Sequence, residues 1–237
     1  MPTRPTTGTR LAATRPATGT PAPPAAEDVH PVPYYSQWAS PELVREIVTG
    51  GLSATEDPKW QSYGASSPEE YDWWSWRLCG MACLRMCLAH WRQPVPTAME
   101  LAAGCERAGA YVRREDGGLD GLIYAPFARH VEANWPLTAE CRPGLPSSEI
   151  PQLLARGRLL MLSVHPSVRE LHPSPPGRGG HLVLAVGATP GALLIHNPSG
   201  FPGESQEYAR IPWDDLDRFY AGRGIVLGLK DRPRPTA

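Results

Sequence analysis

Cys79 stands where a helix is expected to begin, a position from which a thiol can act as a nucleophile. From Cys79 to Trp91 only Arg85 and His90 are polar, which predicts a buried central helix that starts after an aromatic loop. The positive end of the helix dipole lowers the pKa of a thiol in the first turn and favours the reactive thiolate. Gly80 is expected to leave room beside the sulfur for a substrate. The alternative is that Cys79 is a small core residue.

A predicted hairpin in the second half of the chain brings a histidine and an asparagine together. Strands are expected over 182–188 and 192–196, joined by a turn at Thr189 and Pro190. Folding about this turn puts His181 opposite Asn197, within a residue or two of register and with both side chains on one face. Cysteine, histidine and asparagine in this chain order correspond to the nucleophile, the base and the group that orients the base.

The remaining cysteines suggest reduced thiols rather than a disulfide framework. The chain has five cysteines, an odd number, and Cys79, Cys83 and Cys87 are spaced so that they follow one stripe of a helix. Neighbours on such a stripe do not pair without distortion. A zinc site that adds His90 is the alternative. It is disfavoured because three thiolates on a buried helix would leave charge uncompensated, and structural zinc takes close cysteine pairs from loops.

Three stretches of the chain together resemble a known family. They are Val32 to Gln37 (VPYYSQ), Cys79 to Ala82 (CGMA), and Gly180-His181 with its strand followed by Asn197-Pro198. In this order and spacing the sequence resembles papain-like cysteine peptidases, in the branch of the bacteriocin-processing, double-glycine peptidases. The resemblance extends over residues 31–229.

The resemblance implies a role for each matching residue. It makes Cys79 the nucleophile, His181 the base, Asn197 the residue that orients the base, and Gln37 the donor of the oxyanion hole, with Gln61 as the alternative donor. This branch often has an aspartate at the third position, whereas the chain has an asparagine there, as papain does. An asparagine orients the imidazole but adds no charge to stabilise its protonated form. The transporter domain to which peptidases of this branch are usually fused is absent from these 237 residues.

The elements that must position these residues follow a simple order along the chain. Beside the helix at Cys79, helices are predicted over 41–49, 97–106, 119–135, 147–156 and 213–220, and further strands over 159–164 and 224–229. Helices first and strands later predict an α+β domain with an antiparallel sheet. With the resemblance, this becomes a papain-like cysteine peptidase fold, in which a central helix from the N-terminal half carries the nucleophile and packs on the sheet.

Composition sets the domain boundaries and the compartment. Proline, threonine and alanine fill 19 of the first 26 positions, so residues 1–27 are predicted to form a disordered tail. A single peptidase domain is expected over 28–230, with a short tail over 231–237. The net charge of −1 gives no electrostatic basis for binding nucleic acid. No apolar run is long enough for a membrane-spanning segment or a secretory signal. The unpaired thiols favour the cytoplasm.

The function predicted from these features is a cysteine-dependent hydrolase of amide or peptide bonds that works through a thioester acyl-enzyme. Its substrate would be a peptide or a small amide, and neither a cofactor nor a metal is required. One alternative is an acyltransferase or amide-forming enzyme, in which an amine replaces water as the acceptor. Another is a catalytically silent peptide-binding module of the same fold. Nothing in the sequence indicates the oligomeric state.

Overall fold

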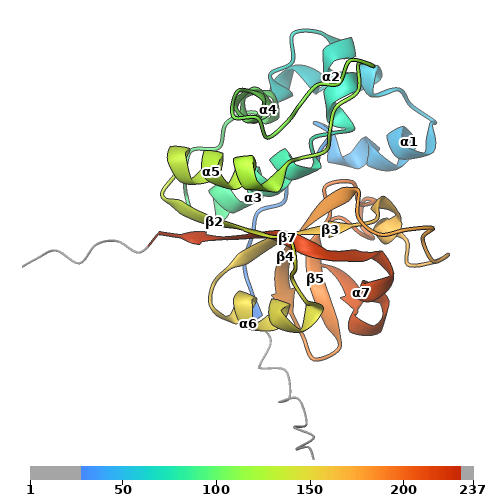
Figure 1. Ribbon diagram of the computed structural model, residues 1–237. Coiled ribbons are helices and arrows are strands. Elements are labelled where there is room, and N and C mark those ends of the chain that lie inside the picture. The colour runs from blue at the N-terminus through green and yellow to red at the C-terminus, as the bar shows by residue number, and fades with distance from the viewer. Residues whose placement is uncertain (1–27, 231–237) are drawn as a thin grey trace, which may run out of the picture.

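In the computed structural model, which describes residues 28–230, five of the seven α-helices precede six of the seven strands along the chain (Figure 1). The expectations for residues 1–27 and 231–237 lie outside the described residues. The α-helices are α1 (Val44–Thr49), α2 (Pro68–Ser75), α3 (Cys79–His90), α4 (Ala98–Arg107), α5 (Tyr124–Asn134), α6 (Ile150–Ala155) and α7 (Trp213–Phe219). Short 3₁₀ helices span Pro41–Leu43, Ala54–Glu56, Trp60–Tyr63, Ser147–Glu149 and Pro166–Arg169.

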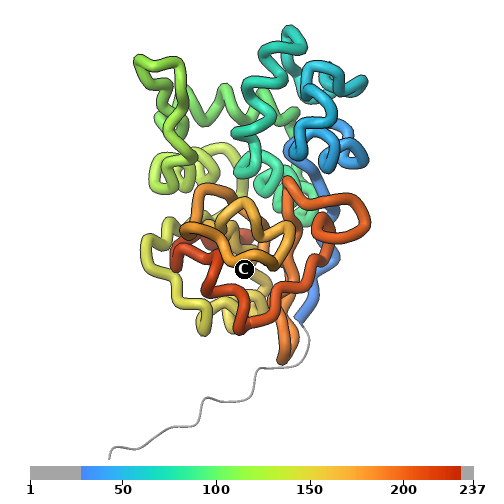
Figure 2. Tube along the Cα trace, turned by 90° about the vertical axis from the view of Figure 1, so that its right-hand side faces the viewer, coloured from blue at the N-terminus to red at the C-terminus, as the bar shows by residue number. Residues whose placement is uncertain are grey.

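The strands form one antiparallel sheet in the order β2-β7-β3-β4-β5-β6, and β1 pairs with β4. They are β1 (Asp28–Val29), β2 (Leu137–Arg142), β3 (Leu159–Val164), β4 (His181–Ala188), β5 (Ala192–His196), β6 (Ala209–Pro212) and β7 (Tyr220–Leu229). Helices α1 to α5 lie on one side of this sheet, whereas α6 and α7 lie on the other (Figure 1). Figure 2 shows the helical layer and the sheet layer from the side.

Each face of the sheet has its own hydrophobic core because side chains alternate along the strands. On β4, Leu182 and Leu184 pack towards α3, whereas Val183 and Ala185 pack towards α6 and α7. Helix α3 is the centre of the first core, and its Cys83 Sγ lies 3.7 Å from the backbone oxygen of Leu182. The predicted α+β class, with a central helix packed on an antiparallel sheet, is therefore confirmed.

Two segments near the site differ from the sequence expectation. The aromatic residues before Cys79 belong mostly to α2 rather than to a loop, because the Ser67 hydroxyl caps the helix and Pro68 occupies its first turn. The helix expected over 119–135 begins only at Tyr124, since Pro126 is tolerated in a first turn but not further along. Residues 119–123 are consequently free to form a loop beside α3. Among the described residues, no helix combines the length and apolar character needed to cross a lipid bilayer.

A buried carboxylate fixes the segment that leads from the first motif into α1. Asp57 is fully buried, and its two oxygens accept hydrogen bonds from the Ser40 backbone N–H at 3.1 Å, the Ser40 hydroxyl at 2.7 Å and the Tyr71 hydroxyl at 2.5 Å. It also accepts a hydrogen bond from the backbone N–H of Lys59 at 2.9 Å. Asp57 therefore ties the chain just beyond Gln37 to α2, the helix that precedes Cys79.

Replacing this carboxylate is expected to destabilise the fold. Asp57→Ala should lower the free energy of unfolding by about 3 kcal/mol, because several buried donors lose their acceptor at once. Urea unfolding followed by circular dichroism measures the change. The matched control is Asp217→Ala, an exposed aspartate on α7, which should change stability by no more than about 0.5 kcal/mol. Equal effects of the two substitutions would contradict the anchoring role of Asp57.

Candidate active site

Cys79 is the first residue of α3, and it lines a cavity of about 570 Å³ between the helical layer and the sheet. His181, the first residue of β4, lines the same cavity. The helical side contributes the loop that leads into α5, and the sheet side contributes residues of β2, β3, β4 and β7. The cavity thus brings the predicted nucleophile and the predicted base to one accessible space.

The structure places His181 and Asn197 in direct contact. The Nε2 atom of His181 lies 2.9 Å from Oδ1 of Asn197, and both residues are buried. The strand register differs from a simple hairpin, because a bulge between Ala185 and Gly187 shifts the pairing of β4 with β5. Continued beyond β5, this register places position 199 rather than position 197 opposite His181. The displacement is two residues, so the two side chains still share a face.

Ser199 is a residue of this cluster that the sequence analysis missed. Its backbone N–H donates to Asn197 Oδ1 at 3.1 Å, and its hydroxyl lies 3.3 Å from that oxygen and 3.2 Å from His181 Nε2. Because the backbone N–H can only donate, it identifies Oδ1 as the acceptor, and His181 Nε2 must then carry a hydrogen. In the neutral imidazole, Nδ1 is left as the free basic nitrogen.

Arg169 holds Ser199 from the other side. Its guanidinium donates to the Ser199 hydroxyl at 2.9 Å and to the Ser199 backbone oxygen at 3.1 Å. Arg169 ends the 3₁₀ helix after β3, a segment with no pattern that would have linked it to the site. The sequence feature that could have linked Ser199 to the site was weak: it lies two residues after Asn197, so the two side chains share a face if the strand continues.

Burial governs the protonation of Cys79 and of His181. It raises the pKa of the Cys79 thiol, although the backbone N–H groups of Leu182 and Gly80 act in the opposite direction. The N–H groups of Cys79 and Gly80 at the helix N-terminus do act to lower this pKa, but loss of solvation outweighs them, so the expected net lowering is wrong. Burial lowers the pKa of His181 to about 4, opposed by the bond to Asn197 and assisted by the positive charge of Arg169. Both directions favour the neutral thiol and the neutral imidazole near pH 7.

Gln37 and Gln61, the two alternatives for the oxyanion hole, have different surroundings. Gln37 is buried, and its backbone N–H donates to the Pro198 oxygen at 3.0 Å, directly after Asn197. Its Nε2 donates to the Ser75 backbone oxygen at 2.9 Å, which leaves the second hydrogen of the amide available. Gln61 is exposed in the 3₁₀ helix Trp60–Tyr63. Neither glutamine lines the cavity, and Gln37 is linked to the cluster through its bond to the residue after Asn197.

The space at Gly80 is not open as the sequence suggested. A Cβ at Gly80 would lie 2.7 Å from Cδ2 of Leu122 and 3.3 Å from Cδ1 of Leu182. The glycine therefore allows the loop before α5 to pack against α3, and this packing contributes to the burial of the neighbouring thiol.

The other cysteines divide into two kinds. All five cysteines are free. Burial raises the pKa of Cys83, Cys87 and Cys105 in the first core. Cys141 on β2 is only half-buried and lines the same cavity as Cys79. Within the part of the chain that the structure describes, no group of three or more histidine, cysteine or acidic residues is arranged to hold a metal ion.

Comparison with known proteins gives matches only among solved structures. No family model matches the chain, and no curated protein is similar to it. One similar structure is a double-glycine motif protease from an AMS/PCAT transporter, solved in complex with the leader peptide. It has 16% sequence identity and a TM-score of 0.46, and the match covers 86% of this chain and 94% of that one.

Two further structures are similar over a shorter part of the chain. A Bacillus anthracis protein described as a C39-like peptidase has 12% identity and a TM-score of 0.47, covering 66% of this chain and 90% of that one. The peptidase domain of Streptococcus ComA, a bifunctional ABC transporter of a quorum-sensing pathway, has 13% identity and a TM-score of 0.42, with coverage of 66% and 93%. The resemblance to double-glycine peptidases is thus also found among solved structures. These values do not place the chain in the family, and the function proposed below rests on the geometry of the site.

Proposed function

We propose that the protein is a cysteine-dependent hydrolase of amide or peptide bonds that uses Cys79, His181 and Asn197. The observation that carries this proposal is the 2.9 Å contact of His181 Nε2 with Asn197 Oδ1, made by a histidine that shares a cavity with a thiol at a helix N-terminus. Acyl transfer through a thioester requires a nucleophile, a base and a group that orients the base, and this contact supports giving those roles to the three residues.

The neutral resting state defines the first chemical step. As Cys79 Sγ attacks the carbonyl carbon of the substrate, Nδ1 of His181 accepts the thiol proton. Asn197 holds the imidazole ring of His181 through Nε2, which leaves Nδ1 available to accept the thiol proton. The backbone N–H of Cys79 and the free hydrogen of the Gln37 amide stabilise the negative charge on the carbonyl oxygen.

The second half of the reaction returns the protein to its starting state. Collapse of the tetrahedral intermediate breaks the C–N bond, and the imidazolium of His181 gives its proton to the leaving amine. A water molecule then attacks the thioester carbonyl carbon while His181 accepts a proton from it. Breaking of the C–S bond releases the acid, and the imidazolium of His181 returns its proton to the Cys79 sulfur, which restores the free thiol. An amine in place of water would give an amide instead, by way of the same acyl-enzyme.

Trapping the thioester tests the proposal. The protein is mixed with a library of peptide amides, quenched in acid and digested, and the peptide that contains Cys79 is examined by mass spectrometry. We expect an acyl adduct on Cys79 and, after longer incubation, the free acid product. Adding an amine such as glycinamide shows from the product mass whether water or the amine accepts the acyl group.

The matched control is Cys141→Ala, which removes the other thiol that lines the cavity. The adduct should persist in this variant and disappear in Cys79→Ala. Turnover that continues in Cys79→Ala, or an adduct only on Cys141, would overturn the proposal.

A further inference from the structure

The strand next to that of His181 carries a serine whose hydroxyl lies at the cavity wall. Ser163 is the polar residue of β3, whose sequence is LLMLSV, and only 2% of its surface is exposed. It pairs in register with Leu182 and lines the cavity. No described residue forms a hydrogen bond with the Ser163 side chain. The Ser163 hydroxyl is therefore a free donor at the cavity wall, available to a polar group of a ligand.

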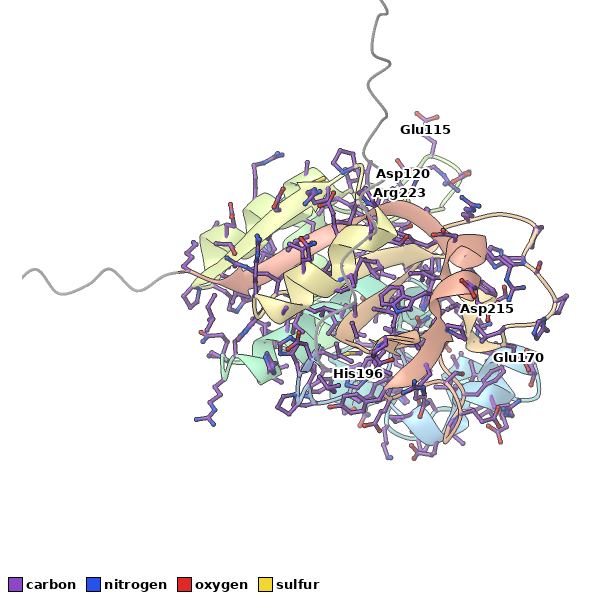
Figure 3. The ribbon with its side chains drawn as sticks, turned by 90° about the horizontal axis from the view of Figure 1, so that it is seen from below. Glu115, Asp120, Glu170, His196, Asp215 and Arg223 are labelled. Atoms are coloured by element: carbon purple, nitrogen blue, oxygen red, sulfur yellow. The ribbon has the colours of Figure 1, made fainter. Side chains whose placement is uncertain are left out.

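A cation on β7 lies beside this hydroxyl. Both groups pack against the bare backbone of Gly179, where a Cβ would lie 3.0 Å from Ser163 Oγ and 3.2 Å from a terminal nitrogen of Arg223. Arg223 is exposed and lines the cavity. Figure 3 shows it on the same side of the molecule as Asp120, the acidic residue of the cavity lining.

The cavity therefore contains more positive than negative charge. No carboxylate of the described residues lies within 4.0 Å of Arg223 or of Arg77, which also lines the cavity. Asp120 is itself 3.6 Å from Arg114. Arg77 is held against the ring of Trp73, with its guanidinium carbon 4.1 Å from the ring centre. An anionic ligand group would therefore find unpaired cations in the cavity.

We propose that Ser163 and Arg223 form a subsite for a carboxylate of the substrate, which gives the protein a preference for an acidic group close to the bond that Cys79 attacks. A guanidinium presents a planar fork of N–H donors that matches a carboxylate, and a hydroxyl adds a further donor. The subsite is close to the reacting groups, because Ser163 is paired with the residue that follows His181. This inference rests on the proposed function, because it takes Cys79 to be the thiol that attacks the substrate.

Matched alkylating probes test this preference without requiring turnover. Iodoacetyl-glutamate amide and iodoacetyl-glutamine amide differ only in the charge of the side chain, and each reacts by displacement of iodide by the thiol sulfur. Iodoacetyl-glycine and its amide test a terminal carboxylate in the same way. The experiment uses a Cys141→Ser background, and labelling of Cys79 is timed by peptide mapping. We expect the carboxylate probe of at least one pair to react about tenfold faster than its neutral partner, as a charge-assisted hydrogen bond allows.

The pair that shows the preference identifies the source of the carboxylate. Equal rates within both pairs would overturn the proposal.

Substitutions then assign the preference to the subsite. Arg223→Gln and Ser163→Ala should each bring the ratio of rates towards one, and Arg223→Glu should favour the neutral probe. The matched control is Arg129→Gln, an exposed arginine on α5 outside the cavity lining, which should keep the wild-type ratio. An unchanged ratio in Arg223→Gln would also overturn the proposal. A carboxylate preference in a protein that forms no acyl adduct would contradict the proposed function alone, so the two failures are distinguishable.

Discussion

Cys79→Ala is expected to abolish turnover of any amide substrate, and His181→Ala to reduce it by about 10³-fold. In the proposed mechanism Cys79 forms the covalent intermediate, so its loss leaves no acyl-enzyme route. His181 must accept a proton from a thiol whose pKa is raised by burial, so the base is needed more here than for a thiol that is already ionised. Loss of a general base typically costs about 10² to 10⁴-fold. Steady-state hydrolysis of a fluorogenic peptide amide measures both effects.

The control for these variants must leave the cavity lining otherwise unchanged and remove a thiol that has no role in the proposed mechanism. Cys141→Ala meets this requirement and should retain most of the activity, because Cys141 lines the cavity from β2 rather than from the helix N-terminus. Circular dichroism and the urea midpoint establish that each variant is folded. A His181→Ala variant as active as the wild type would remove His181 from the mechanism.

The central strands and the central helix of the fold could be predicted because they are apolar and buried on both sides. The strands expected at 159–164 and 192–196 coincide with β3 and β5, and the helix that begins at Cys79 is the central helix α3. In contrast, β2 (Leu137–Arg142) was missed, since its sequence LTAECR mixes polar and apolar residues and the strand lies at the edge of the sheet. Local sequence therefore indicated the buried elements and not the edge of the sheet.

The site was predictable in its residue types but not in its electrostatics. A histidine and an asparagine on adjoining strands could be paired from chain spacing, and the structure puts them 2.9 Å apart. The bulge in β4 could not be predicted, because it depends on how the sheet twists, and Ser199 is brought opposite His181 by that bulge. The pKa of Cys79 was misjudged for a similar reason. Helix position is local, whereas the burial that raises this pKa comes from segments distant in sequence, such as the loop that carries Leu122.

Acidification is expected to destabilise the protein through His181. The pKa of His181 is about 4 in the folded protein, below the ordinary value of 6.5. Between these two values the unfolded chain binds a proton that the folded protein does not, so stability falls as the pH falls. The contribution of His181 is fully present above pH 6.5 and is lost as the pH approaches 4. Each pKa unit corresponds to about 1.4 kcal/mol, so the loss amounts to about 3 kcal/mol.

His181→Gln isolates this contribution from that of other titrating groups. Urea unfolding of the wild type and the variant at pH 4, 5, 6 and 7 gives the free energy of unfolding of each. The variant should lose about 3 kcal/mol less than the wild type between pH 7 and pH 4, since glutamine does not bind a proton in this range. The matched control is Gln152→Ala, an exposed position on α6 outside the cavity lining that changes no titratable group, whose curve should remain parallel to that of the wild type. If the free energy of unfolding of His181→Gln varied with pH in parallel with that of the wild type, His181 would not be held neutral by its surroundings. The first chemical step, which starts from a neutral imidazole, would then be wrong.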